Sequence, residues 1–244
     1  MTILEPQPPR QPFLRLPWPV LFVIGVLATC YAAFALAPPH LQYTIVYDYG
    51  FVPARYSQAY LAAHDYNPGS VLDRALPFVT YIFLHGGLGH LAINCIWLLP
   101  FGAVVARRYG AGLFFVFFLI CGIAGAAAHL AFNWGSTLPV VGASGAISGL
   151  MGAAFRMMEP FPPRFEIPPS ARALAPILSR RIVVWSAVWV GINVVAGVTG
   201  LGTGTQVRLI AWQAHLGGYF AGLFLAGPFA ALAGALERRA AGLR

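Results

Sequence analysis

Four polar side chains in this 244-residue sequence have the types and spacing that acyl-transfer chemistry needs. They are His90, Asn94, Ser144 and His215, and each lies inside a largely apolar stretch. A serine hydroxyl becomes a nucleophile when an adjacent imidazole removes its proton. Histidine and asparagine side chains can donate hydrogen bonds to the oxyanion that forms when a carbonyl is attacked. These four residues therefore predict a serine-based acyl-transfer site, provided that the fold brings them together.

The local sequence Gly142-Ala143-Ser144-Gly145 strengthens this prediction. Glycines on both sides of the serine free its backbone and leave room for a substrate carbonyl. A helix that begins at Ser144 would direct its unpaired amides at that carbonyl, so the Ser144 N–H is expected to be a further oxyanion donor. Because no carboxylate lies near that level of the helices, the pattern predicts a Ser144–His215 dyad without an acidic third member.

The composition indicates that the elements carrying these residues lie in a membrane. Apolar residues make up 59% of the chain and charged residues 9%, whereas a soluble domain has about a quarter of its residues charged. This excludes a soluble globular enzyme, a disordered chain and a nucleic-acid-binding domain. Cys30, Cys95 and Cys121 all lie in apolar runs, which predicts small buried hydrophobic residues and no disulfide framework.

The apolar segments predict six membrane spans, since a spanning helix needs about 20 mostly apolar residues. The expected fold is all-α, a polytopic membrane protein with a six-transmembrane-helix bundle. The first span is interpreted as retained, because Pro38 directly follows the cleavage-like triplet Ala35-Leu36-Ala37. The spans are predicted at roughly 18–37, 86–105, 111–132, 139–157, 182–200 and 209–236, with residues 78–84 in or near the interface.

The arginines predict that both termini are cytoplasmic. With a cytoplasmic N-terminus, twelve of the fifteen basic residues fall in inner segments, and only Arg55, Arg74 and Arg208 fall outside. Cytoplasmic loops collect basic residues, so the net charge of +8 is attributed to orientation and not to a polyanionic partner. The predicted organisation is a flexible Pro-rich cytoplasmic N-terminus at 1–17, a membrane domain at 18–236 with an outer loop of about 38–77 and an inner loop of about 158–180, and a cytoplasmic tail at 237–244.

The depth of the four polar residues predicts that they meet. At 1.5 Å per residue, all four lie roughly 5–11 Å below the outer boundary of three spans that run in the same direction. His90 and Asn94 share a helix face because they are four residues apart. Stripes of small residues let helices approach closely in lipid, so spans 4 and 6 are expected to touch. These stripes contain Ser144, Ser148 and Gly152 in span 4, and Ala214, Gly218, Gly222 and Ala226 in span 6.

Three motifs in this order resemble the signatures of rhomboid intramembrane serine proteases. They are His85-x4-His90-x3-Asn94 in span 2, Gly142-Ala143-Ser144-Gly145 in span 4, and Ala214-His215-x2-Gly218-x3-Gly222 in span 6. Each motif alone recurs by chance, but all three on the corresponding helices of a six-span bundle are specific. The resemblance covers about residues 70–236.

The resemblance implies a function and a set of roles. Ser144 would be the nucleophile, His215 the general base, His90 and Asn94 the oxyanion donors, and His85 a supporting residue. Membrane-protein substrates would enter sideways from the lipid bilayer between spans 2 and 5, and the cavity would open to the outer, periplasmic side. Trp185 and Trp189 either line that entrance or face lipid. No cofactor, metal or nucleic acid is expected, and the composition favours a bacterial inner (plasma) membrane.

Three positions depart from the family pattern. Leu76-Pro77 stands near the usual place of a Trp-Arg pair, Ala106 in place of a glutamate after span 2, and Ser148 in place of an aromatic residue that packs on the catalytic histidine. The remaining in-span polar residues, His129 and Asn193, are expected to pack at the interface and to make a helix–helix hydrogen bond, respectively.

Three other functions account for fewer of these features. The main alternative is a catalytically silent rhomboid-like protein that binds membrane proteins, although such relatives typically lack the serine or the histidine. A metal-dependent enzyme or metal carrier would use His85, His90, His129 and His215, but no His-Glu-x-x-His motif or intramembrane carboxylate completes a zinc site. A transporter would show paired broken helices in two related halves, which the sequence lacks.

Overall fold

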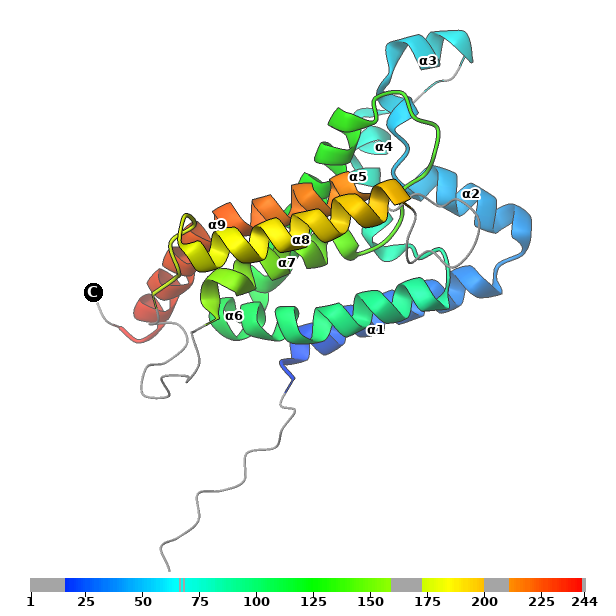
Figure 1. Cartoon of the computed structure of the whole chain (residues 1–244). Helices are drawn as coiled ribbons and strands as arrows, with labels where there is room; N and C mark the ends of the chain where they lie inside the picture. Colours follow the sequence, from blue (N-terminus) through cyan, green and yellow to red (C-terminus); the bar gives the residue numbers. More distant parts are fainter. Residues whose placement is uncertain (1–15, 66, 68, 159–172, 200–210, 243–244) are drawn as a thin grey trace, which may run out of the picture.

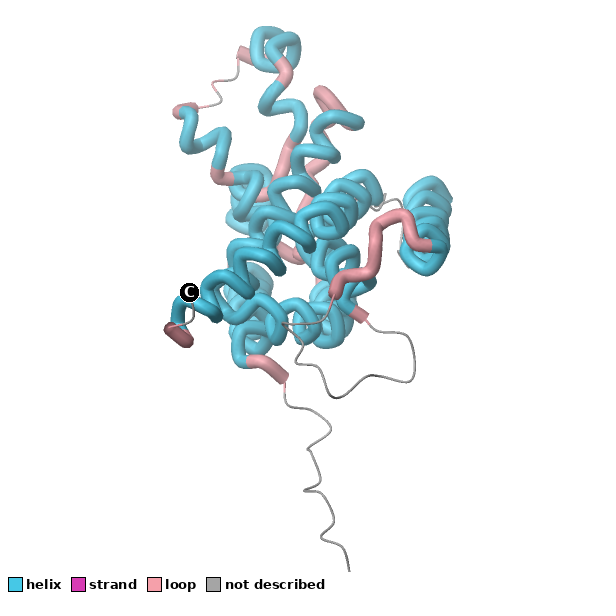
Figure 2. The backbone as a smooth tube through the Cα atoms, turned by 90° about the vertical axis from the view of Figure 1, so that its left-hand side faces the viewer, coloured by secondary structure: helices cyan, strands magenta, loops and turns pink. Residues whose placement is uncertain are grey.

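The structure, a computed structural model, describes residues 16–65, 67, 69–158, 173–199 and 211–242. Across these residues the chain is helix and loop, as Figure 2 shows, and the expected all-α class is confirmed. The described part holds no named strand, and its strand-like feature is an isolated antiparallel bridge between Phe51 and Val140.

Four of the helices are long and apolar enough to cross a membrane: α1 (Trp18–Leu36), α6 (Leu88–Phe132), α8 (Arg180–Thr199) and α9 (Trp212–Ala240). A further helix, α7 (Ser144–Met157), lies among them. The segment between α1 and α6 forms short elements: α2 (Pro39–Tyr49), η1 (Pro53–Tyr56), α3 (Gln58–Ala63), α4 (Val71–Ala75), α5 (Pro77–Thr80) and η2 (Tyr81–Phe83).

Helix α6 is two helical arms joined at Gly110. This glycine has φ 73° and ψ 170°, a backbone conformation that residues with a side chain rarely adopt. It breaks the helix between the predicted second and third spans. His90 in the first arm lies beside Gly142, and Gly125 in the second arm lies beside Gly145. Both arms therefore return to the start of α7, so the chain reverses direction at Gly110 (Figure 1).

Helix α7 is the central helix and packs against both α6 and α9. Eleven of its fourteen residues are buried. Glycines make the approach possible: a Cβ on Gly218 of α9 would overlap the carbonyl oxygen of Gly145, and one on Gly222 would overlap that of Gly149. The expected contact between spans 4 and 6 is confirmed.

The predicted fourth span at 139–157 was too long. Residues 139–143 are not helical, and α7 begins at Ser144. Val140 instead exchanges both backbone hydrogen bonds with Phe51, at 2.9 and 2.8 Å, and Gly142 has φ +124°, which no helix accommodates. At the other end of the bundle, α9 continues to Ala240, beyond the predicted limit at 236.

Helices α1 and α8 lie at the periphery. In Figure 1, α1 runs alongside the first arm of α6, and α8 runs alongside α9, in agreement with the contacts between these pairs. One face of α8 points toward α9 and carries Ile182, Ser186, Trp189, Asn193 and Gly197. The opposite face is exposed and apolar, as a lipid-facing surface would be: Val183, Val184, Trp185, Val188, Ile192, Val195 and Val198.

The segment that corresponds to the predicted outer loop is anchored by backbone pairing and aromatic packing. Besides the Phe51–Val140 bridge, the Ala54 N–H donates to the Ser136 carbonyl at 2.8 Å. The ring of Tyr56 stacks on Phe51 at 5.4 Å and meets Phe78 at 5.5 Å, while its hydroxyl donates to the Arg74 carbonyl. These contacts attach the loop without a Trp-Arg pair.

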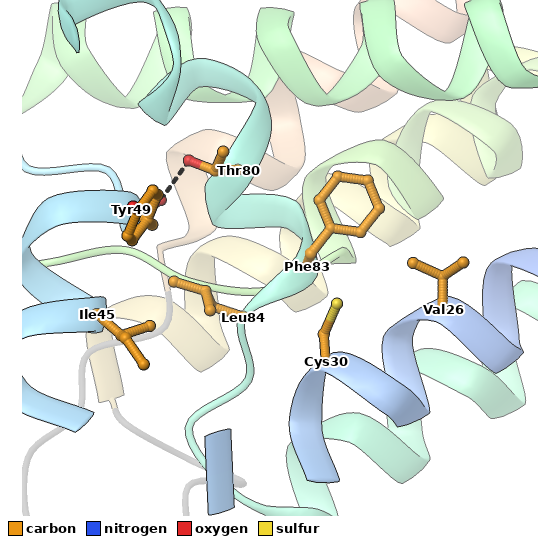
Figure 3. A pocket seen from close by; sticks show the side chains of 7 residues that line it. All are labelled: Val26, Cys30, Ile45, Tyr49, Thr80, Phe83 and Leu84. Carbon is orange, nitrogen blue, oxygen red and sulfur yellow. Dashed lines mark hydrogen bonds between the residues drawn. The ribbon is translucent and has the colours of Figure 1, made fainter. Parts of the chain in front are cut away.

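A cavity of about 420 Å³ lies between α1, α2 and residues 80–84 (Figure 3). Its lining is almost entirely apolar, and the Thr80 hydroxyl donates to the Tyr49 carbonyl at one side. None of the predicted site residues lines it. The lining residues are Val26, Cys30, Ile45, Tyr49, Thr80, Phe83 and Leu84.

Several sequence predictions lie outside the described residues. These include the N-terminal segment up to residue 15, most of the predicted inner loop at 159–172, the ends of spans 5 and 6 at 200 and 209–210, and residues 243–244.

Candidate active site

Ser144 and His215 are hydrogen-bonded to each other. The serine Oγ lies 2.8 Å from Nε2 of the histidine, although the two residues are 71 positions apart. Ser144 is the first residue of α7, and His215 is in the first turn of α9. The pair forms because the small residues along both helices let the backbones meet. This is the geometry that a serine nucleophile and its general base require.

Asn193 of α8 makes the second hydrogen bond to the histidine ring. Its Oδ1 lies 2.7 Å from Nδ1 of His215, and its Nδ2 donates to the Trp189 carbonyl at 2.9 Å. The expected helix–helix hydrogen bond of Asn193 is thus confirmed, but its partner was not predicted. A signal was present in the sequence: Ser186, Trp189 and Asn193 fall at i, i+3 and i+7, which places them on one face of a helix.

His90 and Asn94 lie on the first two turns of α6 and border the same space. The Asn94 Nδ2 donates to the His90 carbonyl at 2.9 Å, and the asparagine is 3% exposed. Gly142 lies against both: a Cβ placed on it would be 2.7 Å from Cε1 of His90 and 3.9 Å from Nδ2 of Asn94. Since Gly142 is two residues before Ser144, all four predicted residues gather at the N-terminus of α7.

The backbone of residues 142–144 is positioned by Tyr81. The Gly142 N–H donates to the Tyr81 carbonyl at 2.8 Å, and the buried Tyr81 hydroxyl donates to the Gly122 carbonyl at 2.7 Å. The same hydroxyl oxygen would lie 3.2 Å from a Cβ atom on Gly125 and 3.0 Å from one on Gly145, so it fills the space that these two glycines leave. Tyr81 therefore connects the loop before α7 to the second arm of α6.

His85 is buried beside His90. It is 1% exposed, and its ring meets that of His90 edge-on with centroids 5.1 Å apart. This position suits the supporting role that the resemblance implies, because the His85 ring limits the rotation of the His90 ring.

The structure places the remaining polar candidates on α6 and α7. His129 is buried near the end of α6, where its Nδ1 lies 3.2 Å from Nδ2 of Asn133, and Ser148 is buried in α7. Among the residues that the structure describes, no group of three or more His, Cys, Asp or Glu side chains is arranged to hold a metal.

Trp185 and Trp189 have different environments, although the sequence left the same two alternatives open for both. Trp185 is 54% exposed, as a lipid-facing residue would be. Trp189 instead stacks on Tyr219 of α9, with centroids 4.4 Å apart and the ring planes 15° from parallel. Only Trp185 fits the lipid-facing alternative.

The fold and the site together define a class: a multi-pass helical membrane protein with a Ser–His pair at the start of its central helix. A family model for the rhomboid domain matches residues 73–231, more than half of the chain. The chain belongs to the rhomboid family. The matched region includes all four predicted site residues as well as Asn193 and His85.

The chain is also similar to the rhomboid protease GluP of Bacillus subtilis (strain 168). The two are 34% identical over 148 residues, which is 61% of this chain and 25% of the relative. The chain thus spans about a quarter of the length of the relative that it matches.

Proposed function

We propose that this protein is an intramembrane serine endopeptidase that cleaves proteins containing transmembrane segments. The observation that carries the proposal is the 2.8 Å hydrogen bond between Oγ of Ser144 and Nε2 of His215. It is supported by the rhomboid family and by similarity to a rhomboid protease. The alternative, a catalytically silent relative, has no need of an assembled serine–histidine pair.

In the proposed mechanism, Nε2 of His215 accepts the Ser144 proton as Oγ attacks the substrate carbonyl. The resulting histidinium gives this proton to the amine that leaves when the peptide bond breaks. Water then attacks the acyl-enzyme while His215 accepts a proton from it. His215 gives this proton to Ser144 Oγ as the ester bond breaks and the carboxylic acid product leaves. His215 carries every proton that is transferred in this cycle.

The oxyanion of each tetrahedral intermediate would be stabilised at the N-terminus of α7. The first amides of a helix have no intrahelical partners, and Ser144 is the first residue of α7. We assign the Ser144 N–H, the Asn94 amide and His90 as donors, because the two side chains lie beside Gly142, two residues before Ser144. Preorganised donors of this kind supply a large part of the catalytic effect in acyl transfer.

We propose six crossings for the membrane domain: α1, the two arms of α6, α7, α8 and α9. The arginine distribution favours cytoplasmic termini. With such termini, the start of α7 would lie toward the outer side, with the outer loop above it. Substrates would enter laterally from the bilayer, past the apolar exposed face of α8. A bacterial inner membrane fits this arrangement, and the similarity to a Bacillus protein supports it.

Labelling with a fluorophosphonate probe tests the proposal, because the probe reacts with a serine only when the hydroxyl is activated. Purified wild type, Ser144→Ala and His215→Ala are compared in mild detergent, with thermal unfolding used to check that each is folded. We expect labelling of the wild type alone. A folded wild-type protein that is not labelled would overturn the proposal and favour the silent relative.

A further inference from the structure

We infer that Asn193 is the third member of the site: a positioning residue on α8 that fixes the tautomer and the plane of the His215 ring. The inference rests on the proposed function and extends it beyond a two-residue dyad. Its basis is the 2.7 Å contact between Oδ1 of Asn193 and Nδ1 of His215.

The orientation of the Asn193 amide is fixed independently of the histidine. A backbone carbonyl can only accept a hydrogen bond, so the atom of the amide that contacts the Trp189 carbonyl at 2.9 Å must be the nitrogen. The atom directed at His215 is therefore the oxygen. An exchange of the two amide atoms would leave two acceptors facing each other at the Trp189 carbonyl.

This orientation determines where the histidine carries its proton. The amide oxygen only accepts, so Nδ1 of His215 must be protonated, and in the neutral ring Nε2 is then unprotonated. An unprotonated Nε2 is what the Ser144 hydroxyl needs as its proton acceptor. When Nε2 takes the serine proton, the Asn193 oxygen faces the Nδ1–H of a charged ring and stabilises it.

Asn193 is itself held by the packing of α8 on α9. One turn and two turns earlier on the same face, Trp189 stacks on Tyr219 and the Ser186 hydroxyl lies 2.7 Å from the Tyr219 hydroxyl. The stacking of Trp189 on Tyr219 sets the rotation of α8 about its axis. With that rotation fixed, the Asn193 side chain is directed at the first turn of α9, where His215 lies.

The small side chain at residue 148 makes the contact between Asn193 and His215 more important for holding the ring. Ser148, one turn after Ser144, is too small to stack on the His215 ring. The ring is therefore held in its plane by hydrogen bonds at both nitrogens, to Ser144 on one side and to Asn193 on the other. Loss of the Asn193 bond would leave Nδ1 without this acceptor, so the tautomer of the ring would no longer be fixed.

The test compares Asn193→Ala, Asn193→Asp and Ser186→Ala with the wild type. Ser186→Ala is the matched control, because it removes another side-chain hydrogen bond between α8 and α9 without removing a partner of His215. The first measurement is the rate constant for fluorophosphonate labelling of Ser144. The second is the nitrogen NMR spectrum of ¹⁵N-histidine-labelled protein, with the His215 signals assigned from their loss in His215→Gln.

We expect Asn193→Ala to be labelled at least about tenfold more slowly than the wild type. This loss is part of the 10²- to 10⁴-fold rate increase that a positioned base contributes. The His215 signals of this variant should change from the Nδ1-protonated form to a mixture of tautomers. Asn193→Asp keeps an acceptor oxygen and should label faster than Asn193→Ala, while Ser186→Ala should label close to wild type. Wild-type rates and an unchanged tautomer in Asn193→Ala would overturn the inference.

The NMR measurement separates this inference from the proposed function. If the wild type were not labelled at all, the protease assignment would fail, yet its spectrum would still show which ring nitrogen carries the proton. The inference predicts protonation at Nδ1 in the wild type, and protonation at Nε2 would refute it. This reading does not depend on whether Asn193→Ala folds.

Discussion

The carbonyl oxygen of Gly149 occupies the position that a Cβ atom on Gly222 would need. Close contact between α7 and α9 therefore depends on the absence of a side chain at residue 222. The same relationship holds one turn nearer the site, between Gly145 and Gly218. These two contacts set the separation of the helices that carry Ser144 and His215.

Gly222→Ala should destabilise the protein and slow fluorophosphonate labelling. The added methyl group forces the helices apart, and overpacking of this kind costs about 1–3 kcal/mol of folding free energy. The measurement is unfolding of the detergent-solubilised protein by sodium dodecyl sulfate, together with the labelling rate. Gly227→Ala is the matched control on α9, because the nearest heavy atom to its Cβ would be 3.9 Å away. Equal stability of the two variants would contradict the close contact described above.

Gly142→Ala should reduce labelling more than it reduces stability. An alanine at φ +124° carries about 1–3 kcal/mol of backbone strain, and its Cβ would lie 2.7 Å from Cε1 of His90. Gly135→Ala, in the same connection between α6 and α7, has a positive φ of 78° but no atom nearer than Ser57 Oγ at 3.9 Å. Both variants should melt at a lower temperature, and only Gly142→Ala should lose labelling. Wild-type labelling by a folded Gly142→Ala would show that the position of His90 does not matter.

Asn94→Ala should lower the labelling rate without abolishing it. One oxyanion donor is worth roughly 3–4 kcal/mol, and the Ser144 N–H and His90 remain as donors. Asn133→Ala is a suitable control, since both asparagines make the same kind of local hydrogen bond. Asn133 Nδ2 donates to the His129 carbonyl at 3.0 Å, and Asn94 Nδ2 donates to the His90 carbonyl at 2.9 Å, in each case four residues earlier. If the two variants were labelled equally fast, Asn94 would have no part in the oxyanion site.

The contact between Tyr56 and Arg74 should persist to high pH. Burial raises the pKa of Tyr56 to about 12, so its hydroxyl continues to donate to the Arg74 carbonyl after exposed tyrosines have ionised. Because the pKa of the folded state is raised, this stabilisation is complete below the ordinary pKa of tyrosine and is lost as the pH rises through about 12. The difference in ultraviolet tyrosinate absorbance between wild type and Tyr56→Phe measures this ionisation. A transition at the ordinary tyrosine pKa would show that Tyr56 is exposed to water.

The sequence was sufficient to predict the elements that carry the site and the level at which they meet. Hydropathy placed α1 and both arms of α6 within a few residues, because lipid-facing and core-facing residues of a membrane helix are both apolar. The common depth of Ser144 and His215 followed from helix rise alone. The Gly142–Gly145 motif indicated a helix that begins at Ser144, but the hydropathy span at 139–157 began too early. Hydropathy does not register pairing: Val140 is as apolar as a helix residue, but its backbone pairs with Phe51.

The partner of Asn193 could not be predicted for a different reason. Sequence spacing gives the face of α8 on which Asn193 lies, but not the rotation of that helix against α9. Stacking of Trp189 on Tyr219 sets this rotation, and an aromatic pair on two separate helices leaves no motif in a single sequence. The different environments of Trp185 and Trp189 have the same origin.

The break at Gly110 has a consequence for how this chain assembles. The reversal uses a single residue, so the two arms of α6 form a hairpin that closes almost no loop and costs little chain entropy. The Ser144–His215 contact, by contrast, joins positions 71 residues apart and can form only when α7 and α9 have both been placed. The hairpin can therefore be complete in a chain whose nucleophile is still inactive, so that the hydroxyl becomes reactive only in the last stage of assembly.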